Sequence, residues 1–235
     1  MRGSFAGRAA LGVAVFVAAS AAQAGTISGT ATYDGKVPAL KPLSVAAEPI
    51  CAKQHDSVPN EMLVLGAGNT MANVLVRVVS GLPAGKAYPA PTTPVTMDQH
   101  GCQYKPHVMG IMVGQPFKVL NSDGILHNVH TTSTANPSFN QAQPKFKKTI
   151  QAKIEKPEMP IKVQCDAHGW MHAWWVSEDH PYYAVTDANG AFKLADVPAG
   201  DYELEAWHET LGKQTQKVKV QPKQDTKVSL EMTKK

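Results

Sequence analysis

Alternation of hydrophobic and polar residues dominates this chain, and the longer period of an amphipathic helix is missing. The alternating stretches predict strands at residues 26–37, 73–81, 116–121, 202–207, 217–220 and 226–232. Tyr202 and Leu204 fall on the side of their strand that should face a core, as do Val228, Leu230 and Met232 on theirs. We therefore expect an all-β protein built from sandwiches.

Glycine and proline mark the expected turns between these strands. Residues 184–194 predict a β-hairpin, because Asn189-Gly190 suits the positive φ angles of a two-residue turn. Residues 81–94 are rich in proline and glycine and predict a linker or a long loop.

Residues 1–24 have the composition of a secretory signal peptide. Arg2 and Arg8 precede an apolar run at 9–22, and small residues ending at Ala24 suit a cleavage site. The run is too short to cross a membrane, and no second one of spanning length follows. We expect a soluble periplasmic protein, cleaved after Ala24, with no membrane span.

The charge balance argues against nucleic acid as a partner. Cleavage after Ala24 removes two arginines and no acidic residue, so the net charge falls from +4 to +2. The lysines between residues 145 and 162 form a locally basic stretch, which we interpret as a solvated face.

Three cysteines in an oxidising compartment leave one unpaired if the other two form a disulfide. Cys165 lies among residues that bind metals, whereas Cys51 and Cys102 do not, so we predict a Cys51–Cys102 disulfide. A second possibility stays open, because His100 and His107 flank Cys102 and could form a metal site with it.

The segment "CDAHGWMH", at residues 165–172, places three types of metal ligand close together. A mononuclear blue-copper site needs two imidazoles, one thiolate and a weak axial thioether. Cys165, His168 and Met171 supply three of these four groups. His127, which follows the strand at 116–121 and a polar turn, supplies the second imidazole.

Two motifs resemble those of the cupredoxins, and of their amicyanin-like members most closely: "HNVH" at 127–130 and C-x2-H-x2-M at 165–171. The resemblance covers about residues 95–177. It implies one copper ion per chain, with His127, Cys165 and His168 as equatorial ligands and Met171 as the axial ligand. It also implies that Asn128 forms a hydrogen bond across to the cysteine loop.

A second resemblance concerns the two ends of the mature chain. "VTDANGAFKLADVPAGDYELEAW", at 185–207, is similar to the end of a carboxypeptidase regulatory-like (transthyretin-related) module, and residues 25–39 are similar to its opening. We expect this module to be split into residues 25–90 and 179–235, with a cupredoxin domain at 91–178 inserted. Two consecutive domains are the alternative. The whole arrangement resembles exported bacterial proteins that are described as methylamine-utilisation-like.

These features predict a periplasmic copper protein that transfers electrons and is not an enzyme. Hydrolase and phosphate-loop motifs are missing, and one cysteine in the ligand loop excludes a binuclear copper centre. By the amicyanin pattern, His168 should reach the surface through an apolar rim of Ile125, Leu126, Gly169 and Trp170, where a cytochrome or dehydrogenase could dock.

Two other functions stay open: a copper chaperone or buffer, and an adhesive or carbohydrate-binding β-module. We expect His130 to lie behind the ligands or at the surface, and His172 to lie on the exposed rim. Trp174 and Trp175 are expected where the two domains meet.

Overall fold

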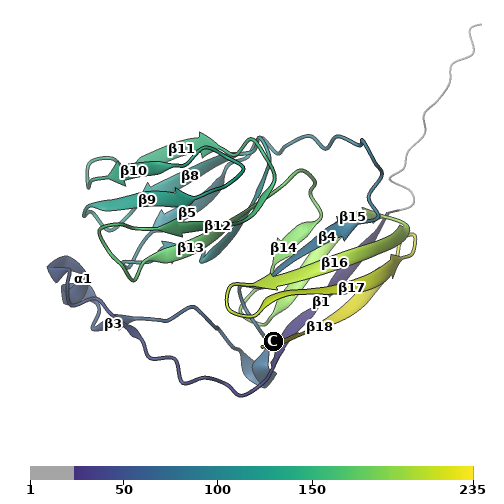
Figure 1. Ribbon diagram of the computed structural model, residues 1–235, viewed down its shortest axis with the longest axis horizontal. Coiled ribbons are helices and arrows are strands. Elements are labelled where there is room, and N and C mark those ends of the chain that lie inside the picture. Colours follow the sequence, from purple (N-terminus) through teal and green to yellow (C-terminus); the bar gives the residue numbers. More distant parts are fainter. Residues whose placement is uncertain (1–23, 235) are drawn as a thin grey trace, which may run out of the picture.

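The computed structural model describes residues 24–234, so the predicted signal peptide, apart from Ala24, lies outside the described residues. The described chain is all-β, with one short helix, α1 (Pro49–Gln54), and one 3-10 turn, η2 (Ala67–Asn69). Its strands form two separate β-sandwiches, which lie side by side (Figure 1). Among residues 24–234, no helix is long and apolar enough to span a bilayer.

The first sandwich, here called the terminal sandwich, takes strands from both ends of the described chain. Its sheets have the strand orders β15-β1-β18 and β14-β4-β16-β17. β1 pairs antiparallel with β15 and parallel with β18, so the first and last strands are neighbours. The strands are β1 (Ala24–Asp34), β4 (Leu75–Ser80), β14 (Tyr183–Val185), β15 (Ala191–Pro198), β16 (Gly200–His208), β17 (Gly212–Val220) and β18 (Asp225–Thr233).

Apolar residues at alternate positions of these strands meet between the two sheets of the terminal sandwich. The inward sets predicted from alternation are confirmed: Tyr202 and Leu204 of β16, and Val228, Leu230 and Met232 of β18, are all buried in this core. Alternation identified the buried face correctly because successive side chains of a strand point to opposite sides.

The second sandwich, here called the central sandwich, is built from the middle of the chain. Its sheets have the orders β10-β9-β12-β13-β7 and β11-β8-β5-β6, and the loop at 81–94 leads into it from β4. The strands are β5 (Val95–Gln99), β6 (Tyr104–Lys105), β7 (Val108–Met112), β8 (Pro116–Asn121), β9 (His127–Thr132), β10 (Asn140–Gln143), β11 (Thr149–Lys153), β12 (Glu158–Gln164) and β13 (His172–Glu178).

The predicted hairpin at 184–194 is wrong. Asn189-Gly190 does lie in a turn, but β14 before it pairs with β4, whereas β15 after it pairs with β1 in the opposite sheet. The turn packs against β1, where the Gly190 carbonyl accepts the Ala31 N–H and a side chain on Gly190 would clash with the Ala31 carbonyl. The turn is therefore a corner between layers of the sandwich.

A long excursion between β1 and β4 reaches from the terminal sandwich to one end of the central sandwich (Figure 1). It carries the two-stranded sheet of β2 (Leu43–Ser44) and β3 (Ser57–Val58), together with α1. A disulfide joins Cys51 of α1 to Cys102 of the central sandwich. Cys102 is therefore not free to bind a metal with His100 and His107.

The two sandwiches contact each other through a small apolar cluster. Trp174 of β13 packs edge-to-face on Trp207 of β16, with 5.5 Å between the ring centroids. Trp174 therefore lies where it was expected, at the contact between the two units. The expectation for Trp175 is wrong, because it points to the opposite side of β13 and is buried in the core of the central sandwich.

Candidate metal centre

Three elements of the central sandwich bring the predicted ligands to one end of it. His127 is the first residue of β9, and Cys165 directly follows β12, which pairs antiparallel with β9. The loop of residues 165–171 then returns the chain to β13. The Cys165 N–H donates to the Met171 carbonyl and the Met171 N–H to the His168 carbonyl, so the loop is closed by its own backbone.

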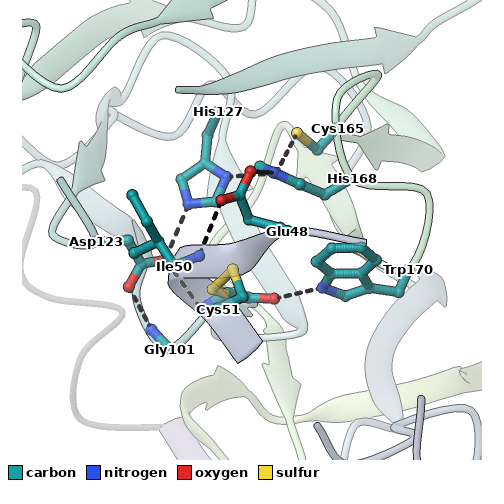
Figure 2. The surroundings of a disulfide bond; sticks show 10 residues. Glu48, Ile50, Cys51, Gly101, Asp123, His127, Cys165, His168 and Trp170 are labelled. Atoms are coloured by element: carbon teal, nitrogen blue, oxygen red, sulfur yellow. Dashed lines mark hydrogen bonds and ion pairs between the residues drawn. A yellow bond between two sulfur atoms is a disulfide. The ribbon is translucent and has the colours of Figure 1, made fainter. Parts of the chain in front are cut away.

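His127, Cys165 and His168 converge in the interior (Figure 2). The Nδ1 atoms of the two histidines are 3.0 Å apart, and the Cys165 Sγ lies 3.5 Å from Nδ1 of His168. All three potential ligand atoms lie within 4.8 Å of one another, and the three residues are no more than 4 % exposed. Two imidazole nitrogens and one sulfur are therefore directed at one small volume.

Met171 completes the loop and is only 2 % exposed. It belongs to the same buried cluster as Cys165, with Ala173 and Trp175. Its thioether is a soft, weak donor of the kind that an axial position takes.

The environment of Cys165 favours a thiolate. Burial alone would raise the pKa of this thiol, but hydrogen bonds with His127, with His168 and with the backbone N–H groups of Asn128 and Ala167 lower it to about 6. A thiolate is the form of cysteine that binds metals. Cys165 is also the only cysteine among residues 24–234 without a disulfide.

Asp123 holds the ring of His127 from the other side, a contact that sequence reasoning missed. Its carboxylate lies 2.9 Å from Nε2 of His127, which leaves Nδ1 directed at Cys165 and His168. The same carboxylate accepts the N–H groups of Gly101 and Cys102 at 2.6 and 2.9 Å. Histidine ligands of metals commonly bind a carboxylate through the second ring nitrogen.

Asn128 fastens the cysteine loop to β9. Its backbone N–H donates to Cys165 Sγ at 3.4 Å, and its side-chain oxygen accepts the N–H of Asp166. Asp166 in turn pairs with His130 at 2.9 Å, and both side chains are partly exposed. These bonds restrain the sulfur and connect His130 to the cysteine loop at the surface.

The expectation that His168 reaches the surface is wrong. His168 is 4 % exposed, because Glu48 of the excursion lies over it with Oε2 3.5 Å from Nε2 (Figure 2). The ring of Trp170 covers another side of the His168 imidazole, with 5.1 Å between the two ring centroids. The sequence could not show this, since Glu48 is 120 residues away.

The surface beside this cover is apolar, although its composition differs from the expected rim. Ile125 is buried, whereas Leu126 is 52 % exposed. Leu126 shares a shallow depression with the exposed side chains of Ile50 and Phe146. We call these three residues, Ile50, Leu126 and Phe146, the apolar patch.

Two further histidines lie together. Cys102 is held in the disulfide, so the alternative metal site with His107 does not form, and the His107 ring packs edge-to-face on His172, with 5.0 Å between centroids. His172 is only partly exposed and is not on an open rim. Both rings face Glu209, which makes a second group of potential metal ligands.

Comparisons with known proteins match separate parts of the chain. Residues 175–233 match the model of the carboxypeptidase regulatory-like domain. No curated protein matches the chain significantly.

Solved structures are similar to part of the chain at low identity. A copper-containing nitrite reductase from Thermus scotoductus SA-01 has 20% identity and a TM-score of 0.33, over 43% of this chain and 26% of that one. An oxidised amicyanin variant has 16% identity and a TM-score of 0.33, over 44% and 98% of the two chains. A purple cupredoxin from Nitrosopumilus maritimus has 17% identity and a TM-score of 0.31, over 36% and 99%.

Proposed function

We propose that the mature protein is a periplasmic type 1 copper protein that carries electrons and is not an enzyme. The observation that carries the proposal is the buried convergence of His127, Cys165 and His168, with Met171 in the same loop. A thiolate, two imidazoles and a thioether form a donor set that suits copper better than it suits zinc or magnesium. Copper bound there would supply one-electron redox chemistry.

The protein's own contribution is to hold these donors still. Asp123 orients His127, Asn128 restrains Cys165, and the backbone bonds of the loop restrain Met171. Donors that keep their positions in both oxidation states lower the reorganisation that accompanies electron transfer. Such a site suits a carrier better than a chaperone, whose ligands must release the metal.

The surroundings of His168 indicate how a redox partner would approach. Glu48 and Trp170 cover the imidazole, so a partner would contact this cover and the neighbouring apolar patch. A small apolar surface suits the brief, low-area encounters of electron-transfer proteins. We propose a periplasmic cytochrome or dehydrogenase as the partner class.

The carrier proposal is tested by kinetics on the copper-loaded mature protein. We expect one copper per chain, reduction by a small cytochrome within the millisecond range of stopped-flow mixing, and slow loss of copper to a chelator. Glu48→Ala should leave copper binding intact and speed reduction, because it uncovers His168. Slow reduction together with rapid copper loss would instead favour the chaperone function.

Asp123 provides a test of the site's architecture. Asp123→Asn should weaken copper affinity by about 10- to 100-fold, because the neutral amide holds the His127 ring less firmly. Competition with a copper chelator measures this affinity. Asp201→Asn changes an exposed aspartate of the terminal sandwich and is the matched control. An affinity equal to that of the control would show that Asp123 does not position His127.

A further inference from the structure

We propose that His107, His172 and Glu209 form a second metal site, for a divalent transition metal such as Zn²⁺. One potential ligand atom from each of the three residues lies within 4.8 Å of the other two. Both Nε2 atoms face the same carboxylate: that of His107 lies 2.5 Å from Oε1 of Glu209 and that of His172 lies 3.3 Å from Oε2. Two imidazoles and one carboxylate are a known ligand set for zinc.

The spacing of these atoms is close to that of a bound metal. Zinc lies about 2.0–2.2 Å from nitrogen and oxygen ligands in a tetrahedral arrangement, so two of its ligand atoms are about 3.3–3.6 Å apart. The Glu209 carboxylate needs to move away from His107 Nε2, which now lies 2.5 Å from Oε1, by about 1 Å. Its 3.3 Å distance from His172 Nε2 already fits. A cavity of about 10 Å³, bordered by His107, His172 and Glu61, adjoins the cluster.

A second observation is that His107 is 3 % exposed, while its Nδ1 has no hydrogen-bond partner among residues 24–234. The nearest carboxylate on that side is Glu61, with Oε2 3.7 Å away. A proton on Nδ1 would be directed at Glu61 and would leave Nε2 free to bind a metal, which is how carboxylates support histidine ligands. Trp174 Nε1 similarly orients Glu209, at 3.0 Å from Oε2.

The position of the site gives it a structural role. His107 lies between β6 and β7, and His172 begins β13, so both belong to the central sandwich. Glu209 follows β16 of the terminal sandwich, 102 residues from His107. A metal held by all three would connect the two sandwiches. It would also lie next to the proposed copper loop, because His172 directly follows Met171.

The test counts zinc bound to the metal-free mature protein by calorimetry, in a two-by-two set of variants. The wild type should bind at two sites. Glu209→Gln should lower the zinc affinity of the second site by at least 10-fold, and Cys165→Ser should do the same at the proposed copper site. The double variant should weaken both sites. His172→Gln should repeat the effect of Glu209→Gln, and His100→Ala, which removes an exposed histidine, should change neither site. Near-ultraviolet circular dichroism checks that each variant is folded.

Cobalt distinguishes the two sites independently of copper. The Co²⁺ ion whose binding Glu209→Gln removes should lack thiolate charge-transfer absorption in the wild type. The Co²⁺ ion bound at Cys165 should show that absorption. If Cys165→Ser changes nothing while Glu209→Gln removes one equivalent, the second site stands and Cys165 is not a zinc ligand. The copper proposal is then decided separately, by the colour of the copper-loaded protein. If Glu209→Gln and His172→Gln bind as much zinc as the wild type, the cluster is only an ion-paired contact between the sandwiches.

Discussion

Replacing Cys165 by serine is expected to abolish the intense visible colour of the copper-loaded protein. That colour arises when a thiolate donates charge to Cu(II), and a hydroxyl does not donate charge in this way. The hydrogen bonds that lower the pKa of Cys165 to about 6 stabilise the thiolate of the wild type before any metal binds. Absorption spectra of the two proteins, each titrated with Cu(II), measure the effect.

Met171→Leu is the matched control for this variant, because it changes a buried residue of the same loop. It should keep the colour and raise the reduction potential, since losing a weak axial donor disfavours Cu(II). Copper bound elsewhere, for example at His107 and His172, would give only weak absorption without a thiolate. A Cys165→Ser protein that keeps an intense band would therefore contradict the assignment of Cys165 as a ligand.

The ligand candidates could be found in the sequence because three of them lie in one short loop. The spacing from Cys165 to Met171 restricts what these side chains can reach, and a strand pattern before His127 indicated a neighbouring turn. The all-β class followed from alternation in the same way, and the structure is all-β over residues 24–234. Local patterns were enough for both conclusions.

Contacts between distant segments could not be predicted. Glu48 over His168 depends on the path of the excursion between β1 and β4, and Glu209 meets His107 only because two sandwiches pack together. The turn at Asn189-Gly190 has the composition of a hairpin, but pairing with β1 and β4 separates its two strands. The contact of Asp123 with His127 is local, because Asp123 precedes His127 by four residues in a polar turn. It could therefore have been predicted from the sequence.

Removing the Cys51–Cys102 disulfide is expected to lower the free energy of unfolding by about 2–4 kcal/mol. The bond closes a loop with a sequence separation of 51 residues, so its loss frees a long segment of the unfolded chain. The double variant Cys51→Ala/Cys102→Ala avoids leaving either partner of the disulfide as a new free thiol. Guanidinium denaturation of the metal-free protein measures the effect without a contribution from bound metal.

The same variant should also weaken copper binding, because the disulfide restrains the backbone of Cys102, which contacts residues around the site. Gly101 donates its N–H group to Asp123, which orients His127 (Figure 2). Cys102 donates its N–H group to the same carboxylate, and its carbonyl accepts Trp170 Nε1 at 3.0 Å. The colour should survive, since all four proposed ligands remain. Metal-free wild-type protein treated with a reductant should lose the same stability as the variant. Unchanged stability in both, with unchanged copper affinity in the variant, would show that the packing of α1 holds this part of the site without the bond.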